Sequence, residues 1–173
     1  ASLWAGDAAR GRALAGFDGS RPILLVMGGS LGAQAVNSAA LAVLSELLAR
    51  FDVVHLCGRG KVDGSVKRPG YKAFEYLGET MGDVLAAADI VVSRAGANTV
   101  FELIAARKPA LLIPLPKSQS RGDQIVNAEY CRRKGFAVVL AQEDLTPQTM
   151  LAALDALSQD KETYIAAMTA YPN

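Results

Sequence analysis

The sequence predicts an α/β fold with a Rossmann-like, doubly wound parallel sheet. Apolar runs without polar alternation, typical of strands buried on both faces, alternate along the chain with segments of helical pattern. A glycine-rich turn joins the first of these runs to the helix expected after it. Polar motifs follow several predicted strands directly, at the carboxyl ends where doubly wound sheets bind their ligands.

The composition indicates one globular domain. The 173 residues are 51% hydrophobic and 20% charged, enough for a sizeable core. A net charge of +1 gives no support for nucleic-acid binding, so no nucleic-acid partner is expected. A single histidine excludes a multi-histidine metal site, and Cys57 and Cys131 are expected to be reduced, structural cysteines. No stretch is long and apolar enough to span a bilayer, and no signal peptide opens the chain.

The first residue is Ala1, so we expect a fragment of a longer protein. Residues 1–20 are small and polar, and they indicate a linker or interdomain segment, or a short helix, with Trp4 as an anchor. Residues 21–173 then form the folded domain. Hydrophobic pattern and glycine placement predict, in order, strand Ile23–Met27, a helix near Gln34–Arg50, strand Asp52–Cys57, an exposed loop Gly58–Gly70, strand Lys72–Leu77 and helix Met81–Ala88.

The second half continues the alternation of strands and helices. Thr146 and Pro147 are typical of an N-cap followed by proline at the first helical position, and Gly135 is typical of a helix end. The predicted elements are strand Ile90–Ser93, helix Thr99–Ala106, strand Pro109–Pro114, helix Asp123–Lys134, strand Phe136–Leu140, a helix from Thr146 and a further helix after Ser158.

The glycine turn after Ile23–Met27 is a candidate phosphate cradle. Gly28, Gly29, Ser30 and Gly32 let backbone N–H groups approach an anion, and a helix N-terminus adds partial positive charge. The order G-G-S-L-G matches neither the dinucleotide fingerprint nor a Walker loop. A turn that serves only tight packing remains the alternative.

Two later strand-to-helix junctions, Ser93–Glu102 and Pro114–Ala128, also carry polar residues. Together with the glycine turn, they should face one crevice at the carboxyl ends of the strands. In S-R-A-G-A-N-T-V-F-E, which ends at Glu102, that carboxylate is a candidate partner for a ribose diol, or it merely complements the helix dipole. Arg94 is a candidate phosphate ligand, or it pairs with a carboxylate. Asp123 and Gln124 are candidates for sugar hydroxyls, or for N-capping, and Asn127 lies one turn further on to support the same loop.

These motifs together resemble the MurG family of peptidoglycan N-acetylglucosaminyltransferases. The resemblance rests on G-G-S-L-G-A, on H-L-C-G-R-G at His55–Gly60, on S-R-A-G-A-N-T-V-F-E and on S-R-G-D-Q-I-V-N-A, in that order, and it covers about Gly16 to Leu157. The family has two Rossmann-like domains of GT-B architecture. The resemblance implies that this chain is the C-terminal domain, which binds the donor UDP-GlcNAc, and that the N-terminal acceptor domain is absent.

The resemblance also implies roles for particular residues. Ser30, beside Gly29 and Gly32, contacts the donor phosphates, and Glu102 binds the ribose hydroxyls. Backbone groups at Leu77 and Gly78 hold uracil. Arg94, Gly96 and Asn127 belong to the same motifs. Gln124 reads the sugar with Asp123, where many relatives have a second glutamine, so the role of Asp123 is the less certain. The family's linker arginine cannot be placed in this chain.

The implied reaction is inverting transfer of GlcNAc to lipid I, giving lipid II at the inner face of the plasma membrane by a peripheral membrane enzyme. No DxD metal-binding motif is apparent, so no metal is expected, and a helix N-terminus can stabilise the departing diphosphate without one. No catalytic residue is expected in this chain, which alone should be inactive. His55 is expected to be structural or part of the loop architecture. Two alternatives are a UDP-GlcNAc 2-epimerase, which a single histidine disfavours, and a donor-binding subunit like those of dolichol-type GlcNAc transferases.

Overall fold

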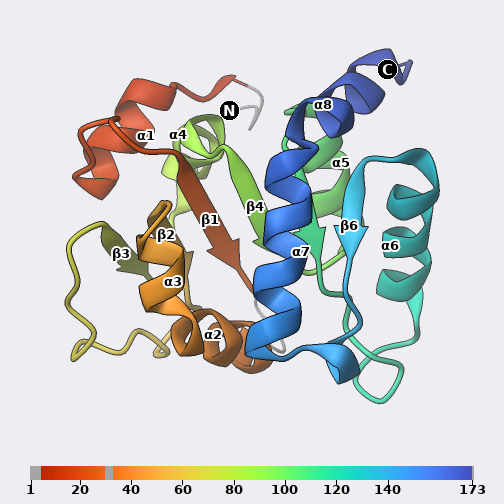
Figure 1. Cartoon of the computed structure of the whole chain (residues 1–173), viewed down its shortest axis with the longest axis horizontal. Helices are drawn as coiled ribbons and strands as arrows, with labels where there is room; N and C mark the ends of the chain where they lie inside the picture. Colours follow the sequence, from red (N-terminus) through yellow and green to blue (C-terminus); the bar gives the residue numbers. More distant parts are fainter. Residues whose placement is uncertain (1–4, 30–32, 173) are drawn as a thin grey trace. The chain divides into compact units, whose positions relative to one another are not determined.

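The computed structural model describes residues 5–29 and 33–172 of the chain. It divides into two compact units, Ala1–Asp89 and Ile90–Asn173. Within each unit the strands are parallel and alternate with helices (Figure 1). The predicted α/β class with parallel strands is therefore confirmed.

The first unit is built on strands in the order β3-β2-β1. Met27 pairs with Leu56, and Leu56 pairs with Phe74, so the three strands end at one edge. Strand β1 is buried along nearly all of its length, as its unbroken apolar run predicted. The elements are α1 (Ala8–Ala15), β1 (Ile23–Met27), α2 (Ala33–Ala42), α3 (Leu44–Leu48), β2 (Asp52–Leu56), β3 (Tyr71–Phe74), the 3-10 turn η2 (Gly78–Thr80) and α4 (Met81–Ala87).

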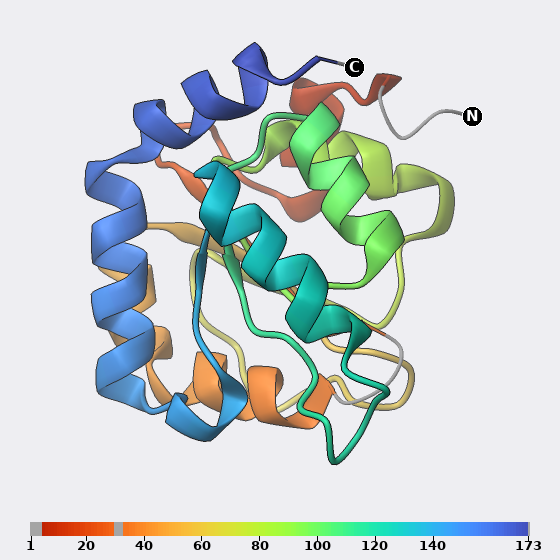
Figure 2. The same ribbon diagram turned by 90° about the vertical axis from the view of Figure 1, so that its right-hand side faces the viewer.

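The second unit has the strand order β4-β5-β6. Helices α5 and α6 cover one face of these strands and α7 covers the other (Figure 2). Leu111, Met150 and Leu154 are fully buried between these layers. The elements are β4 (Ile90–Ser93), α5 (Ala97–Ala105), β5 (Ala110–Leu112), α6 (Asp123–Lys134), β6 (Ala137–Val139), the 3-10 turn η3 (Gln142–Asp144), α7 (Pro147–Gln159) and α8 (Lys161–Ala170).

Helix α1 is the short helix that was one of two predictions for residues 1–20, and it packs on α4. The Asp83 carboxylate accepts hydrogen bonds from the Asp7 N–H (2.7 Å) and from Arg10 Nε and Nη2 (3.0 Å each). Gly11 lies so close to α4 that a Cβ there would fall 2.2 Å from the Asp83 carbonyl oxygen. This segment is therefore docked on the first unit from Asp7 onward. Trp4, the predicted anchor, lies outside the described residues.

The single helix predicted near Gln34–Arg50 is wrong in one respect, because the structure divides it into α2 and α3. The buried residues Val36, Ala40, Leu44 and Leu47 have the spacing of one continuous helix, so periodicity contains no sign of the break. The break lies at Val43, whose φ of −114° and ψ of 19° leave the helical region. Its N–H bonds to Ala40 three residues back, a local 3-10 tightening.

The predicted strand Lys72–Leu77 is displaced and shortened to β3. Its partner β2 ends at Leu56, and the last bond between the two segments joins the Cys57 N–H to the Phe74 carbonyl at 2.9 Å. Without a partner strand, the chain beyond Phe74 turns into η2. Strands Ile23–Met27 and Ile90–Ser93 have their predicted bounds. Most other predicted elements begin or end one or two residues away from the bounds in the structure, as is usual at the ends of helices and strands.

Two helix boundaries agree with prediction. Helix α6 runs from Asp123 to Lys134, and Gly135 ends it in the left-handed region at φ 72°. Thr146 caps α7 through a reciprocal pair of bonds with Thr149, and Pro147 is its first residue. Caps are predicted well because the signal lies in adjacent residues.

The turn after helix α5 places Arg107, a residue with a side chain, in a backbone conformation that favours glycine. This gives a prediction about stability. Arg107, which follows the cap residue Ala106, has φ 54°, and the N–H of Lys108 donates to the Leu103 carbonyl at 2.9 Å. This arrangement favours glycine. The left-handed conformation costs residues other than glycine about 1–2 kcal/mol, and the greater freedom of glycine in the unfolded chain offsets part of this gain. We therefore expect Arg107→Gly to raise the free energy of unfolding by about 0.5–1 kcal/mol, measured by urea unfolding. Arg107→Ala, which removes the charge but keeps a Cβ, is the control, and an equal gain from it would contradict the backbone explanation.

Candidate functional site

The glycine turn follows the buried strand β1, as predicted. Gly28 is buried and Gly29 is exposed. Gly29 has φ 78°, a left-handed backbone conformation that residues other than glycine adopt only at a cost in free energy. A Cβ at Gly29 would meet nothing within 4 Å, so backbone conformation rather than crowding requires this glycine. Ser30 and Gly32, the predicted phosphate contacts, lie outside the described residues.

Leu77 and Gly78 form a tight turn after β3. The Leu77 carbonyl accepts hydrogen bonds from the Thr80 N–H (3.2 Å) and hydroxyl (2.7 Å). Gly78 has φ 53°, and a Cβ there would lie 3.4 Å from the ring of the exposed Tyr76. The backbone expected to hold uracil is therefore fixed by local bonds before any ligand arrives.

Gln124, in the first turn of α6, joins two of the loops that follow strands in the second unit. Its Oε1 accepts hydrogen bonds from the N–H of Ala95 (3.3 Å), after β4, and of Leu115 (3.0 Å), after β5. Both of those residues are buried. The carboxamide oxygen of Gln124 therefore serves the structure. The carboxamide nitrogen, Nε2, lies near Gly96, at 3.9 Å from the position that a Cβ on Gly96 would occupy.

Asn127 lies one turn after Gln124 and holds the same loop. Its Nδ2 donates to the Ala95 carbonyl at 2.9 Å, so side chains of α6 bind both backbone groups of Ala95. This agrees with the supporting role predicted for Asn127. Asp123 is exposed at the start of α6, where its charge complements the helix dipole.

Arg94 is buried, with 4% of its surface exposed, and its Nη1 donates to the Ile113 carbonyl at 3.1 Å. Burial lowers the pKa of its guanidinium. Within the second unit this side chain fastens the end of β4 to the chain just after β5. Its placement favours support of the loop over direct contact with a phosphate.

Glu102 lies in the second turn of α5, which begins after the cap residue Gly96. The first N–H groups of any helix have no partner within the helix, and Gly96 has no side chain to accept from them. Burial raises the pKa of the half-buried Glu102 carboxyl. Among the described residues no group is hydrogen-bonded to this carboxylate. It is therefore available to accept hydrogen bonds from a ligand.

His55 is fully buried in β2 and makes two hydrogen bonds within the first unit. Its Nε2 lies 2.9 Å from Asn37 Oδ1 on α2, and its Nδ1 lies 2.9 Å from the Tyr71 hydroxyl on β3. Asn37 Nδ2 donates to the Cys57 carbonyl at 2.9 Å. These contacts confirm the structural role predicted for His55. Cys57 and Cys131 are also buried and free, as predicted.

The buried His55 gives a pH prediction. Burial lowers its pKa to about 4. Because the unfolded chain binds this proton below its ordinary pKa of about 6.5, the free energy of unfolding should rise with pH between these values, by up to about 1.4 kcal/mol per pH unit. This stabilisation is complete above about pH 6.5 and is lost as the pH falls toward the folded-state pKa.

Urea unfolding of the native chain and of His55→Gln across this pH range tests the prediction. The difference in unfolding free energy between the two proteins should grow with pH and then level off. A constant difference between the two curves would show that His55 titrates alike in the folded and unfolded states.

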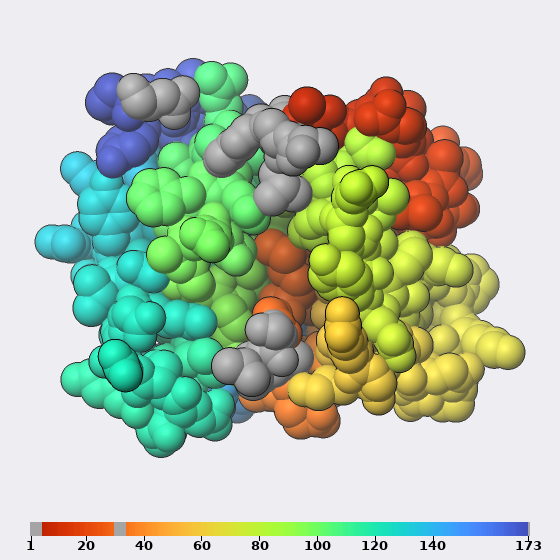
Figure 3. Space-filling model, turned by 180° about the vertical axis from the view of Figure 1, so that it is seen from behind, coloured from red at the N-terminus to blue at the C-terminus, as the bar shows by residue number. Residues whose placement is uncertain are grey.

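Two features of the structure were not predicted from the sequence. Phe101 on α5 and Val126 on α6 expose 67% and 68% of their surface, and these helices form the green and teal surface in Figure 3. Asn37 and Tyr71, the partners of His55, were not singled out either. A polar residue among the apolar positions of α2, next to Val36, was the available signal for Asn37.

The described part of the chain contains no group of three or more histidine, cysteine, aspartate or glutamate side chains placed to hold a metal ion. Of the helices in residues 5–29 and 33–172, none has the length and apolar character needed to cross a membrane.

Curated relatives match almost the whole chain. A UDP-N-acetylglucosamine–N-acetylmuramyl-(pentapeptide) pyrophosphoryl-undecaprenol N-acetylglucosamine transferase of Geobacillus kaustophilus is 53% identical over 160 residues, 92% of this chain and 45% of the relative. An enzyme of the same name from Bacillus thuringiensis, numbered 1, is 47% identical over 166 residues, 96% of this chain and 47% of the relative. The chain thus spans about half the length of these relatives.

Solved structures show the same fold. The crystal structure of Acinetobacter baumannii MurG superposes with a TM-score of 0.76 at 25% identity, covering 98% of this chain and 50% of that one. The calicheamicin glycosyltransferase CalG4 gives 0.67 at 22% identity, covering 86% and 36%. The predicted fold, the C-terminal half of a GT-B glycosyltransferase, is thereby confirmed. Because the model of the glycosyltransferase family 28 C-terminal domain also matches residues 23–172, the chain belongs to that family.

Proposed function

We propose that this chain is the donor-binding domain of an inverting N-acetylglucosaminyltransferase of peptidoglycan synthesis. The observation that carries the proposal is 53% identity, over 92% of the chain, to a relative named for transfer of N-acetylglucosamine to a pyrophosphoryl-undecaprenol acceptor. Two observations support it: no group in the described part of the chain is hydrogen-bonded to the Glu102 carboxylate, and Gln124 and Asn127 hold the neighbouring loops in place. Neither the epimerase nor the dolichol-type subunit has an observation in its favour.

In this proposal the bound donor is UDP-GlcNAc. Glu102 accepts hydrogen bonds from the ribose diol, and backbone groups at Leu77 and Gly78 bind uracil. Gln124 Nε2, with Asp123 beside it, donates to the sugar hydroxyls. The segment with Gly29, Ser30 and Gly32 contacts the diphosphate, and Arg94, Gly96 and Asn127 shape the loop that leads to Glu102.

In the whole protein the missing N-terminal domain binds lipid I and supplies the catalytic base. A hydroxyl of lipid I attacks the anomeric carbon of GlcNAc, the bond to the diphosphate breaks, and UDP leaves with its charge stabilised by backbone N–H groups, with no metal required. The site of this reaction is the inner face of the plasma membrane, where the whole protein acts as a peripheral enzyme.

Titration calorimetry with UDP-GlcNAc, UDP and ADP tests the donor assignment. We expect UDP and UDP-GlcNAc to bind and ADP to bind at least about 10-fold more weakly, because adenine leaves the polar groups that read uracil unpaired. Equal affinity for UDP and ADP would indicate a generic phosphate site. In a lipid I assay the 173-residue chain should show no turnover unless the N-terminal domain is added, and turnover by the chain alone would contradict the proposal.

A further inference from the structure

The segment from the end of β2 to the start of β3 carries a concentration of positive charge. Residues 59–72 contain five lysines and arginines and one acid, Asp63, although the whole chain has a net charge of only +1. The rest of the chain is therefore net acidic, and the positive charge of this segment is local. The five cations are all exposed, and we call them the basic patch: Arg59, Lys61, Lys67, Arg68 and Lys72.

Local hydrogen bonds give the segment that carries the patch a defined conformation. The Ser65 hydroxyl and N–H both donate to Asp63 Oδ1, at 2.6 and 2.9 Å, and lower the pKa of that carboxyl. The Gly60 N–H donates to Glu75 Oε1, beyond β3, at 3.1 Å. The Asp63 carboxylate thus serves its own turn, and among the described residues it forms no ion pair with the basic patch.

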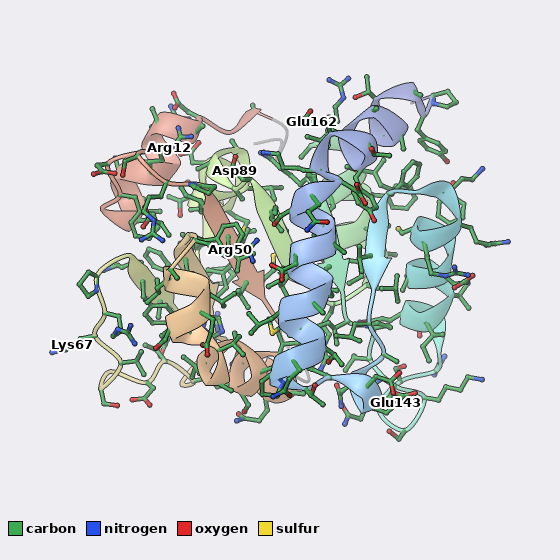
Figure 4. All side chains as sticks on the ribbon, in the orientation of Figure 1. Arg12, Arg50, Lys67, Asp89, Glu143 and Glu162 are labelled. Carbon is green, nitrogen blue, oxygen red and sulfur yellow. The ribbon has the colours of Figure 1, made fainter. Side chains whose placement is uncertain are left out.

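The cations of the patch do not converge on one point. The Arg59 guanidinium lies over the ring of Tyr76, 5.8 Å from its centroid. Arg68 Nη1 donates to Ser45 Oγ on α3 at 3.2 Å, whereas Lys67 extends away from α3 (Figures 1 and 4). Cations spread in this way do not form a pocket for a single phosphate. They fit a ligand whose negative charge is distributed over an area.

A membrane surface with anionic lipids is the occupant that these observations favour. Basic segments are attracted to the negative potential of such a surface. The relative named above transfers its sugar to a pyrophosphoryl-undecaprenol acceptor, which is a lipid. Tyr76, 71% exposed beside Arg59, is a side chain of the kind that lies at the level of lipid headgroups. A nucleic acid is also an extended polyanion, but a net charge of +1 gives it no support.

We propose that the basic patch binds the anionic headgroups of the membrane that holds the lipid acceptor. The donor-binding domain then touches the membrane with a surface of its own, through electrostatic attraction and without inserting a helix. This inference rests on the proposed function, because that function gives the protein a lipid-linked substrate.

Co-sedimentation with lipid vesicles, in the absence of nucleotide, tests the proposal. The vesicles contain about one-third phosphatidylglycerol in phosphatidylcholine, and we expect half-saturation of the native chain below about 1 mM accessible lipid, since each cation near such a surface strengthens binding about 5-fold. Binding should be lost at about 0.5 M NaCl, where the charges are screened, and on phosphatidylcholine alone. Binding that persists in either condition would overturn the proposal.

The variant Lys61→Gln/Lys67→Gln removes two exposed cations that make no hydrogen bond or ion pair within the described structure. We expect it to bind the anionic vesicles about 10- to 30-fold more weakly and to keep the melting temperature of the native chain. Arg133→Gln/Lys134→Gln, at the exposed end of α6, changes the net charge equally and is the matched control. Equal losses in the two variants, or no loss in the first, would overturn the proposal.

Competition experiments separate the membrane from other anions. Inorganic phosphate at constant ionic strength should not displace the native chain from the vesicles, and displacement would indicate a single phosphate site instead. Tighter binding to a short DNA duplex than to the vesicles, at the same salt concentration, would assign the patch to nucleic acid. Either result would overturn the proposal.

Titration with UDP keeps this inference distinguishable from the proposed function. The Lys61→Gln/Lys67→Gln variant should bind UDP as the native chain does, because neither lysine belongs to the proposed donor site. A native chain that binds the vesicles but not UDP would contradict the proposed function and leave the membrane surface established. One that binds UDP but not the vesicles would overturn only the present inference.

Discussion

Replacing Gln124 with alanine is expected to lower the free energy of unfolding by about 2–4 kcal/mol. The variant removes the oxygen that accepts from the N–H groups of Ala95 and Leu115, at 3.3 and 3.0 Å. Both residues are buried, so each N–H loses its partner where water is scarce. A buried donor without a partner costs about 1–3 kcal/mol, and water admitted beside the half-buried Gln124 reduces the sum. Urea unfolding at neutral pH measures the loss.

Gln124→Glu is the matched control, because a carboxylate accepts from both N–H groups and is favourable in the first turn of α6. It should keep the stability of the native chain. It also removes the Nε2 donor, so under the proposed function it should weaken UDP-GlcNAc binding while leaving UDP binding nearly unchanged. A stable Gln124→Ala variant would contradict the structural role of the oxygen, and full UDP-GlcNAc affinity in Gln124→Glu would contradict the ligand role of the nitrogen.

Features coded by adjacent residues were predicted from the sequence. Helix α6 begins at Asp123 and ends at Lys134 before Gly135, as its glycines and charged residues indicated. Thr146 and Pro147 open α7 for the same reason. The apolar run from Ile23 is a buried parallel strand because burial on both faces removes polar alternation.

Features that depend on distant partners could not be predicted. Nothing beside Asp7 in the sequence shows that Asp83 binds its N–H and docks α1. The single Gln124 oxygen joins two loops that lie 9 and 29 residues away, and no local pattern encodes such a bond. The sequence identified Gln124 as polar and well placed, but only the folded chain divides its carboxamide into a structural oxygen and an available nitrogen.

Glu102 is the residue proposed to bind the ribose of the nucleotide. Its carboxyl is half buried, and burial raises its pKa, so the charged form is disfavoured in the free protein. It lies in the second turn of α5, beyond the first turn where a helix dipole stabilises a carboxylate. The hydrogen bonds proposed from the ribose hydroxyls would favour the charged form of this carboxylate, which burial disfavours in the free chain.

Replacing Glu102 with glutamine is accordingly expected to weaken UDP binding by about 10- to 100-fold, since charge-assisted hydrogen bonds contribute about 1.5–3 kcal/mol. The variant should be at least as stable as the native chain near neutral pH, because a partly desolvated charge is removed. The control is Glu162→Gln, an exposed acid in the first turn of α8 (Figure 4), which changes the net charge equally and should leave UDP affinity unchanged.

The 2′-deoxy analogue of UDP completes the test of Glu102. The native chain should bind it more weakly than UDP, and Glu102→Gln should discriminate less between the two, because the partner of the 2′-hydroxyl has been weakened in the variant. Calorimetric titration of both nucleotides and a thermal melt of each protein measure these effects. A lowered melting temperature with unchanged UDP affinity would show that Glu102 serves only the helix, and it would contradict the proposed ribose contact.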